Sequence, residues 1–190
     1  LQHEQSHVAF ERFARTKQAK ISASPFVAQL DDWALKSSEQ NFFPLQLKAK
    51  QDGYALDLTL GNSPVTLHGE NGYSQKTAKG HASYYFSYPF LPTTGTLTFN
   101  GKAYKVSGNA WYDREWSASL LDKSQLGWDW FSLVSSTNPK QGLMLFCIRD
   151  GEQNYDYCSG SRIAADGKAT AIPREQIRMQ VLAHTTIDGT

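Results

Sequence analysis

Charge of either sign is scarce in this sequence, and so are cysteine and long apolar runs. Only 19% of the residues are charged, and the formal net charge is +1. This balance argues against a nucleic-acid-binding protein, which needs a basic patch or stripe. No apolar run approaches the ~20 residues that a helix needs to span a bilayer. The two cysteines, Cys147 and Cys158, are too few for a disulfide scaffold.

Aromatic residues, in contrast, are abundant. They make up 13% of the chain, with ten Phe, nine Tyr and five Trp, and such residues suit strands and cavity walls better than surface helices. The length of 190 residues is enough for one domain with a full core. We see no repeat and no linker, so we expect a single domain over residues 1–190.

The hydrophobic pattern from residue 43 onward is typical of β-strands. Apolar residues alternate with polar ones on both sides of Asp52-Gly53, which predicts a hairpin. Asn100-Gly101 predicts a second hairpin, between Thr96–Phe99 and Ala103–Trp111, with positive φ in its turn. Further expected strands are Phe26–Leu35 (which also resembles a helix start), Pro64–His68, His81–Tyr88, Trp128–Ser135, Leu143–Arg149, Tyr155–Ile163 and Gln176–His184. The sequence therefore predicts an all-β fold, an antiparallel barrel or barrel-like sandwich.

One segment near the N-terminus has a different period. Between Val8 and Lys20, the residues Phe10, Phe13 and Ala14 recur at helical spacing. We expect a short helical segment there, or a loop.

The densest chemistry lies between Gly108 and Phe131, which holds four of the five tryptophans. Alternate residues of a strand share a face, so Trp111, Asp113 and Glu115 point one way. Tyr112, Arg114 and Trp116 then point the other way, and Trp128 and Trp130 share a face after the intervening loop.

This pattern admits a catalytic interpretation and a structural one. A carboxyl group in an indole-walled cavity can act as a proton donor, and indole faces can stabilise a cation. Asp113 and Glu115 would then be the catalytic candidates, suited to protonating a carbon–carbon double bond. Alternatively, either carboxylate pairs with Arg114, Arg149 or a backbone amide and only closes one end of the fold.

The aromatic candidates for a ligand-binding wall are the residues around these carboxylates and on the strand at 81–88. They are Trp111, Tyr112, Trp116, Trp128, Trp130 and Tyr84, with Tyr85 and Tyr88 beside the last. Packing in an ordinary core is the alternative for each.

Several motifs, taken together and in order, resemble one family. They are GNAWYDREWS at Gly108–Ser117, GWDWFSL, GLMLFCIR, LHGENGYSQK at Leu67–Lys76, and ASYYFS at Ala82–Ser87. The sequence is similar to the AttH-type lipocalin-like proteins, which are related to the carotenoid 1,2-hydratases and often described as predicted secreted hydrolases. The similarity runs from about Val8 to about Gly167.

The resemblance implies a protein of two tandem lipocalin-like domains, of which this chain corresponds to much of the first. The partners implied are an apolar small molecule and the second domain. The resemblance also implies export, to the periplasm or as a membrane-associated lipoprotein. Carried over from the hydratases, Asp113 would be the proton donor and Trp111 its aromatic neighbour, and His81 is the candidate for a histidine that those relatives use.

Two other motifs resemble known binding sites but lack essential parts. His3-Glu4-Gln5-Ser6-His7 matches the H-E-x-x-H pattern of zinc proteases, but no third ligand follows, so we predict no metal site. The loop around Gly69 and Gly72 lacks the Gly-Lys-Ser/Thr run of a phosphate cradle. No motif predicts a cofactor.

Cys147 and Cys158 flank a turn. If residues 151–154 form the loop, the two cysteines face each other and can form a disulfide. If Asp150-Gly151 is the turn, they remain two buried thiols. An exported family favours the disulfide.

Three functions remain in competition. The first is binding of an apolar, isoprenoid- or lipid-like ligand in a β-barrel cavity. The second is an acid-catalysed hydratase, isomerase or cyclase acting on a polyene or isoprenoid. The third is a structural or partner-binding domain of an exported assembly.

Overall fold

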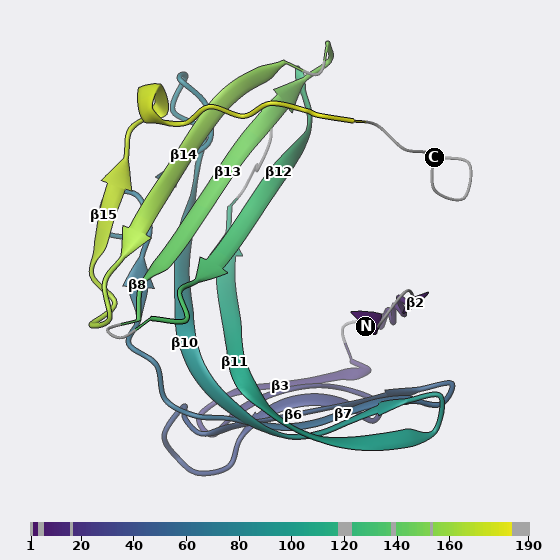
Figure 1. Ribbon diagram of the computed structural model, residues 1–190. Helices are drawn as coiled ribbons and strands as arrows, with labels where there is room; N and C mark the ends of the chain where they lie inside the picture. The colour runs from purple at the N-terminus through teal and green to yellow at the C-terminus, as the bar shows by residue number, and fades with distance from the viewer. Residues whose placement is uncertain are drawn as a thin grey trace. The chain divides into compact units, whose positions relative to one another are not determined.

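The structure is a computed structural model that describes residues 2–3, 6–15, 17–117, 123–137, 140–152 and 154–183. Within these residues, nearly all regular structure is antiparallel strand, which confirms the predicted all-β class. The chain forms two compact units, Leu1–Ser63 with Phe90–Ala110, and Pro64–Pro89 with Trp111–Thr190. Two long strands, β10 (Ala82–Phe99) and β11 (Lys102–Trp116), contribute to both units (Figure 1).

The first unit is built on an antiparallel meander. Its strands are β3 (Ala19–Ala23), β4 (Phe26–Leu30), β5 (Trp33–Ser37), β6 (Leu45–Gln51) and β7 (Tyr54–Leu60). They lie side by side in chain order, and β7 pairs with the later half of β10, which neighbours β11.

Both hairpins predicted from turn residues are present. Asp52 and Gly53 have φ of 46° and 85°, and Asn100 and Gly101 have φ of 48° and 78°. Two consecutive residues with positive φ match the right-handed twist of the flanking strands, which is why Asp-Gly and Asn-Gly are favoured there. These two short sequences therefore set the register of β6 with β7 and the turn between β10 and β11.

Of the two alternatives predicted for Val8–Lys20, a short helix or a loop, the described residues contain the loop and not the helix. Val8–Arg15 has no regular secondary structure, and the strand β3 begins at Ala19. The Phe10 ring packs on Tyr54 with centroids 5.7 Å apart, and the Arg12 guanidinium lies 4.4 Å from the ring centroid of Trp33. So short a helix is marginal by itself, and these contacts with the sheet favour an open segment.

The second unit has two layers. One is a four-stranded sheet in the order β12 (Gln125–Val134), β13 (Gly142–Asp150), β14 (Tyr155–Ile163) and β15 (Ala169–Ile172). The other is the first part of β10 with the short strands β8 (Thr66–Leu67) and β9 (Tyr73–Gln75). Within the described part of the chain β11 and β12 end separate sheets, so this unit is a sandwich and not a closed barrel.

The core of this unit lies between its layers. Met144, Phe146 and Ile148 alternate along β13 and are almost completely buried. Tyr85 of β10 and His68, which follows β8, are buried opposite them. This alternation is expected of a strand with one face in the core.

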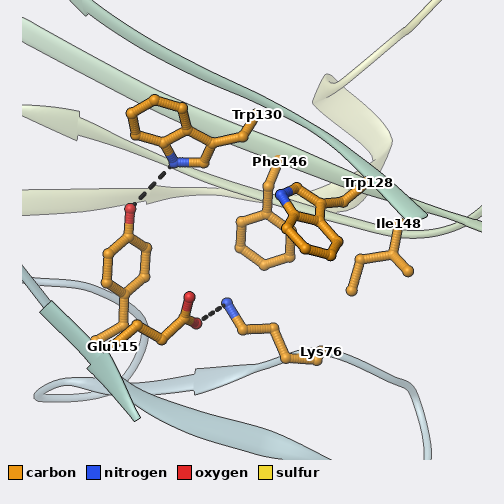
Figure 2. Close-up of a pocket in the computed structure, with 7 residues that line it drawn as sticks. Lys76, Glu115, Trp128, Trp130, Phe146 and Ile148 are labelled. Atoms are coloured by element: carbon orange, nitrogen blue, oxygen red, sulfur yellow. Dashed lines mark hydrogen bonds and ion pairs between the residues drawn. The ribbon is translucent and has the colours of Figure 1, made fainter. Parts of the chain in front are cut away.

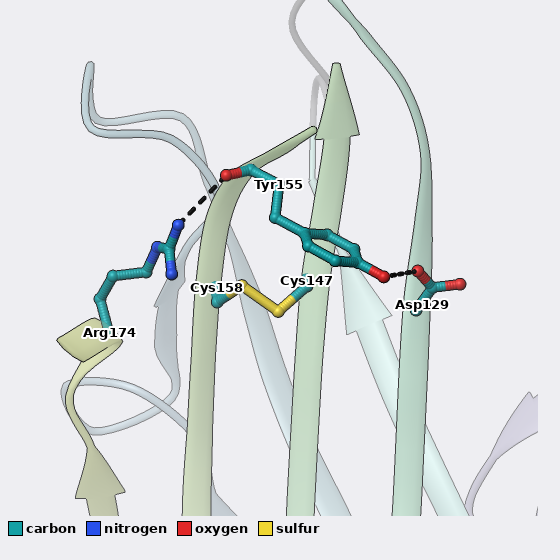
Figure 3. Close-up of a disulfide and its surroundings, with 5 residues drawn as sticks. All are labelled: Asp129, Cys147, Tyr155, Cys158 and Arg174. Atoms are coloured by element: carbon teal, nitrogen blue, oxygen red, sulfur yellow. Dashed lines mark hydrogen bonds between the residues drawn. A yellow bond between two sulfur atoms is a disulfide. The ribbon is translucent and has the colours of Figure 1, made fainter. Parts of the chain in front are cut away.

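Cys147 and Cys158 form a disulfide on the outer face of the sheet (Figure 3). They are directly opposite in the register of β13 and β14, with Cα atoms 4.1 Å apart. Of the two alternatives left open by the sequence, the bridged one is therefore correct. β13 ends at Asp150 and β14 begins at Tyr155, and this spacing brings the two cysteines opposite each other.

The predicted strand Gln176–His184 is wrong over its described part. A 3₁₀ turn, η1 (Arg174–Gln176), is followed by residues without regular structure as far as Ala183, and His184 lies outside the described residues. Ile177 is buried in a second small core with the disulfide and Ile172. Ile177 and the partly buried Met179 thus pack on the outer face of the sheet without joining its ladder.

Candidate functional site

Asp113 of β11 is the point where several polar groups of the second unit meet. Its Oδ1 atom accepts hydrogen bonds from the Tyr85 hydroxyl at 3.0 Å, from the indole N–H of Trp111 at 2.8 Å, and from the Ser87 hydroxyl. Trp111 shares a face of β11 with Asp113, and Tyr85 and Ser87 share a face of the neighbouring β10. Period-two alternation on two adjacent strands thus brings all four side chains together.

A buried histidine stands behind this group. The Nε2 atom of His68 lies 2.7 Å from Ser87 Oγ, and its Nδ1 atom lies 3.2 Å from Ser161 Oγ. The side chain is completely buried. Burial and, to a smaller extent, the positive charge of Lys76 together lower the pKa of His68 to about 4, so the imidazole is neutral near pH 7.

The directions of these hydrogen bonds follow from the donor count. A serine hydroxyl has one proton, and that of Ser87 is donated to Asp113. Ser87 Oγ must therefore accept from His68, whose Nε2 carries the proton. His68 Nδ1 is then an acceptor, and Ser161 donates to it. The order Ser161, His68, Ser87, Asp113 is one directed series.

Tyr85 links Asp113 to the opposite layer. Its hydroxyl oxygen accepts from the indole N–H of Trp130 at 3.1 Å. Burial raises the pKa of Tyr85, and the charge of Asp113 raises it further. The phenol therefore keeps its proton and acts as a fixed donor to the carboxylate.

Tyr85 lines a small pocket, which has an apolar wall on one side (Figure 2). Trp128 and Trp130 of β12 and Phe146 and Ile148 of β13 form that wall, facing Glu115 and Lys76. The cavity is about 70 Å³, room for about two water molecules or one compact apolar group. It is not enclosed, because Trp128 and Trp130 remain 57% and 40% exposed.

Glu115 and Lys76 form an ion pair at this pocket. Lys76 Nζ lies 2.6 Å from Glu115 Oε1, and the lysine side chain is only 8% exposed. The ammonium also donates to Ser74 Oγ at 3.2 Å and lies 4.1 Å from the ring centroid of Phe146. Burial lowers the pKa of Lys76, and the hydrogen bond and charge of Glu115 offset part of that effect.

The proposed pairing of these carboxylates with arginine is not what the structure contains. Arg149 pairs with Asp129 instead, and the Tyr155 hydroxyl donates to the same aspartate at 2.9 Å (Figure 3). The Arg149 guanidinium lowers the pKa of Asp129. In the described part of the chain, the donors to Asp113 are neutral groups, and the cation paired with Glu115 is Lys76.

Six of the residues singled out from sequence come together at this site: Tyr85, Trp111, Asp113, Glu115, Trp128 and Trp130. Three of the other aromatic candidates do not. Tyr84 and Trp116 stack on each other with centroids 5.7 Å apart, and Tyr112 packs near Tyr88 at 6.0 Å. Tyr84, Tyr112 and Trp116 alternate with the site residues along β10 and β11, so they lie on the other face, and their role in ligand binding stays a prediction.

His81 lies just before β10 and outside the pocket lining. Its backbone anchors the turn after β9, accepting from the Lys76 amide at 2.7 Å and donating to Thr77 Oγ1 at 3.2 Å. Its Nδ1 atom is buried without a hydrogen-bond partner among the described residues. The buried histidine next to Asp113 is His68, not His81.

The sequence analysis does not single out His68 or Lys76 as site residues. Both lie in the motif Leu67–Lys76, whose alternate residues Ser74 and Lys76 point inward and are buried. Gly69 holds this loop close: its φ is 65°, and a Cβ there would lie 2.1 Å from the Tyr73 carbonyl oxygen. The sequence signal that could have identified them is the polar residue at every second position of this motif, next to the predicted strand at 81–88.

The H-E-x-x-H motif does not form one helix face. His3 and His7 lie on two short paired strands, β1 (Gln2–His3) and β2 (Ser6–His7). Glu4 and Gln5 lie outside the described residues. Among the residues that are described, no cluster of His, Cys, Asp and Glu is arranged to hold a metal ion, and no helix is long and apolar enough to cross a membrane.

Comparisons with known proteins agree with the family resemblance found in the sequence. A family model described as AttH-like matches residues 1–190. No curated protein matches the chain.

Two solved structures resemble it. A crystal structure described as an AttH from Nitrosomonas europaea is 31% identical, with a TM-score of 0.69 over 79% of this chain and 46% of its own. Kievitone hydratase from Nectria haematococca is 22% identical, with a TM-score of 0.59 over 77% of this chain and 45% of its own. The second likeness shows the fold alone. The chain thus spans about half the length of either structure.

Proposed function

The chain belongs to the AttH-like family, and from this premise we propose that the second unit binds an apolar ligand against the indoles of Trp128 and Trp130. The observation that carries the proposal is the pairing of an apolar wall with charged groups in one pocket. Pockets for small molecules are mostly apolar, with a few convergent polar groups that orient the ligand.

The exposure of the two indoles supports a ligand larger than the cavity. Trp128 and Trp130 leave much of their apolar surface in water, and such surface favours binding partners. A compact apolar end fits the cavity of about 70 Å³, while the rest of the molecule lies along the exposed indoles.

The test is a titration with N-phenyl-1-naphthylamine, a neutral apolar dye whose fluorescence rises on binding. We expect saturable binding that Trp128→Ala weakens about tenfold, since aromatic truncation at a binding site costs more than 1 kcal/mol. Trp116→Ala is the matched control, because Trp116 is similarly exposed but lies on the other face of β11. No saturable binding, or equal loss in both variants, would count against the proposal.

A second candidate function is acid-catalysed hydration of the bound ligand, favoured by the arrangement around Asp113. Three donors hold Oδ1, so a proton on this carboxyl group is carried by Oδ2. Transfer of that proton to one carbon of a double bond leaves a cation on the other carbon. Water adds there and returns a proton to the carboxylate, so the net change is addition of one water molecule.

The experiment for this candidate incubates the protein with an extract of apolar metabolites. Mass spectrometry should detect compounds that gain one water molecule, and Asp113→Asn should abolish the gain. Unchanged products with Asp113→Asn would end the role of Asp113 as acid.

Export of the protein is part of the same proposal. The Cys147–Cys158 disulfide supports it, because disulfides persist in oxidising compartments such as the periplasm. Fractionation of the source cells, with immunodetection of the protein, tests it directly. The tandem arrangement with a second lipocalin-like domain stays a prediction.

A further inference from the structure

Glu115 uses only one of its two carboxylate oxygens within the described part of the chain. Oε1 accepts both from Lys76 Nζ at 2.6 Å and from the Ser83 hydroxyl. Oε2 has no hydrogen bond to any described residue, although the side chain lines the pocket and is 32% exposed. A carboxylate has about four acceptor sites, so this oxygen can accept from a group in the pocket.

Lys76 does not offer a comparable donor. An ammonium has three N–H groups. One is directed to Glu115 Oε1 and one to Ser74 Oγ, and the remaining face of the ammonium lies over the ring of Phe146. The lysine therefore holds the carboxylate in position and balances its charge, and the carboxylate is the group that meets a ligand.

We propose that the ligand of this pocket carries a hydrogen-bond donor, a hydroxyl or N–H group, on its apolar body, and that this group donates to Glu115 Oε2. The inference rests on the proposed function, because it describes the ligand of the same pocket. An anionic or purely carbonyl-bearing molecule would set its lone pairs against those of the carboxylate. A cationic one would meet the ammonium of Lys76 beside it.

Two probes of nearly the same shape test the donor requirement. 2-Naphthol has a hydroxyl group, and 2-methoxynaphthalene has an oxygen at the same place but no proton to donate. Binding of each is followed at pH 7 by the indole N–H resonances of the tryptophans in ¹⁵N-labelled protein. We expect 2-naphthol to bind about tenfold more tightly, the effect of one hydrogen bond to a charged group.

The preference must depend on Glu115. Glu115→Met alone would leave Lys76 buried and unpaired, which destabilises a protein strongly, whereas replacing both members of a buried pair is often tolerated. The double variant Lys76→Met with Glu115→Met should therefore fold, bind both probes, and lose the preference for 2-naphthol. The same double exchange at the exposed Lys48–Asp57 pair of the first unit is the control and should keep the preference.

The outcomes separate the two proposals. Equal binding of the two probes by the unmodified protein, or a preference that survives in the Lys76 and Glu115 double variant, would overturn the donor requirement alone. Failure of both probes and of N-phenyl-1-naphthylamine to bind would overturn the apolar-ligand function and this inference with it. A tenfold preference that only the pocket variant loses supports both.

Discussion

Trp130 donates its indole N–H to the phenol oxygen of Tyr85, with Nε1 and Oη 3.1 Å apart. Trp130 belongs to β12 and Tyr85 to β10, so this bond joins the two layers of the second unit. The Tyr85 hydroxyl proton is in turn donated to Asp113. One phenol therefore fixes both an indole of the apolar pocket wall and the carboxylate beside it.

Tyr85→Phe should destabilise the protein, because it leaves the Trp130 N–H without its acceptor and removes one donor from Asp113. Loss of a hydrogen bond between neutral groups costs about 0.5–1.5 kcal/mol, and loss of one to a charged group about 1.5–3 kcal/mol. We expect the free energy of unfolding, measured by urea denaturation, to fall by an amount of this order. Tyr84→Phe is the control, since Tyr84 is 55% exposed on the opposite face and its change should stay within about 0.5 kcal/mol. Equal losses in the two variants would contradict the role of this hydrogen bond.

His68 should remain neutral, with the proton on Nε2, from pH 8 down to about pH 5. This follows from its lowered pKa of about 4 and from the donor direction set by Ser87. Long-range ¹H–¹⁵N NMR distinguishes the two neutral tautomers and the imidazolium. A proton on Nδ1, or an imidazolium at pH 6.5, would refute the directed series that ends at Asp113.

The same lowered pKa predicts how stability depends on pH. An unfolded histidine titrates near 6.5, above the folded value of about 4, so between these values the unfolded state binds more protons. The free energy of unfolding therefore falls as the pH drops from 6.5 to 4, with a contribution of about 3 kcal/mol from His68. His68→Gln keeps a side-chain N–H donor but does not titrate, so its stability should fall less over this range. Parallel pH profiles for the two proteins would contradict the assignment.

Loss of the Cys147–Cys158 disulfide should lower the stability of the second unit. The bridge closes a loop with a sequence separation of 11 residues, and a loop of this size contributes about 3 kcal/mol in the chain-entropy model. Cys147→Ala with Cys158→Ala should lower the melting temperature in calorimetry. A reductant should lower it for the unmodified protein and leave the double variant unchanged. The idea fails if the reductant affects both proteins alike.

Gly69 should tolerate alanine far less well than Gly80. Both have positive φ, 65° and 94°, so alanine at either place is strained by about 1–2 kcal/mol. At Gly69 the added Cβ would also lie 2.1 Å from the Tyr73 carbonyl oxygen, whereas at Gly80 it meets no described atom within 4 Å. Overpacking should make Gly69→Ala about 1–3 kcal/mol worse than Gly80→Ala in urea denaturation. Similar values would show that the loop next to His68 relaxes freely.

Local sequence determined much of the fold because strands and tight turns depend on near neighbours. Asp52-Gly53 and Asn100-Gly101 formed their hairpins, since positive φ at two consecutive positions is a local requirement. Where the outcome depended on distant partners, local reasoning failed. The spacing of Phe10 and Phe13 favoured a helix, but Phe10 packs on Tyr54 and Phe13 stays exposed.

The prediction of a strand in the C-terminal tail was wrong for a related reason. Alternation of apolar and polar residues is typical of a strand, yet it shows only that every second side chain can share an environment. Ile177 is buried without strand pairing, because it packs in the small core with Cys147, Cys158 and Ile172. Whether an alternating segment joins a ladder depends on a free neighbouring edge, and no local pattern encodes that.

The sequence by itself determined the class of the fold and the shared face of Trp111, Asp113 and Glu115, because alternation along a strand is an intrinsic property of an extended backbone. Only the tertiary structure decided which groups meet those carboxylates. His68 and Ser161 are 93 residues apart, and Lys76 comes well before Glu115 in the chain. Such neighbours follow from the pairing and packing of whole strands, which depend on the burial of the complete core.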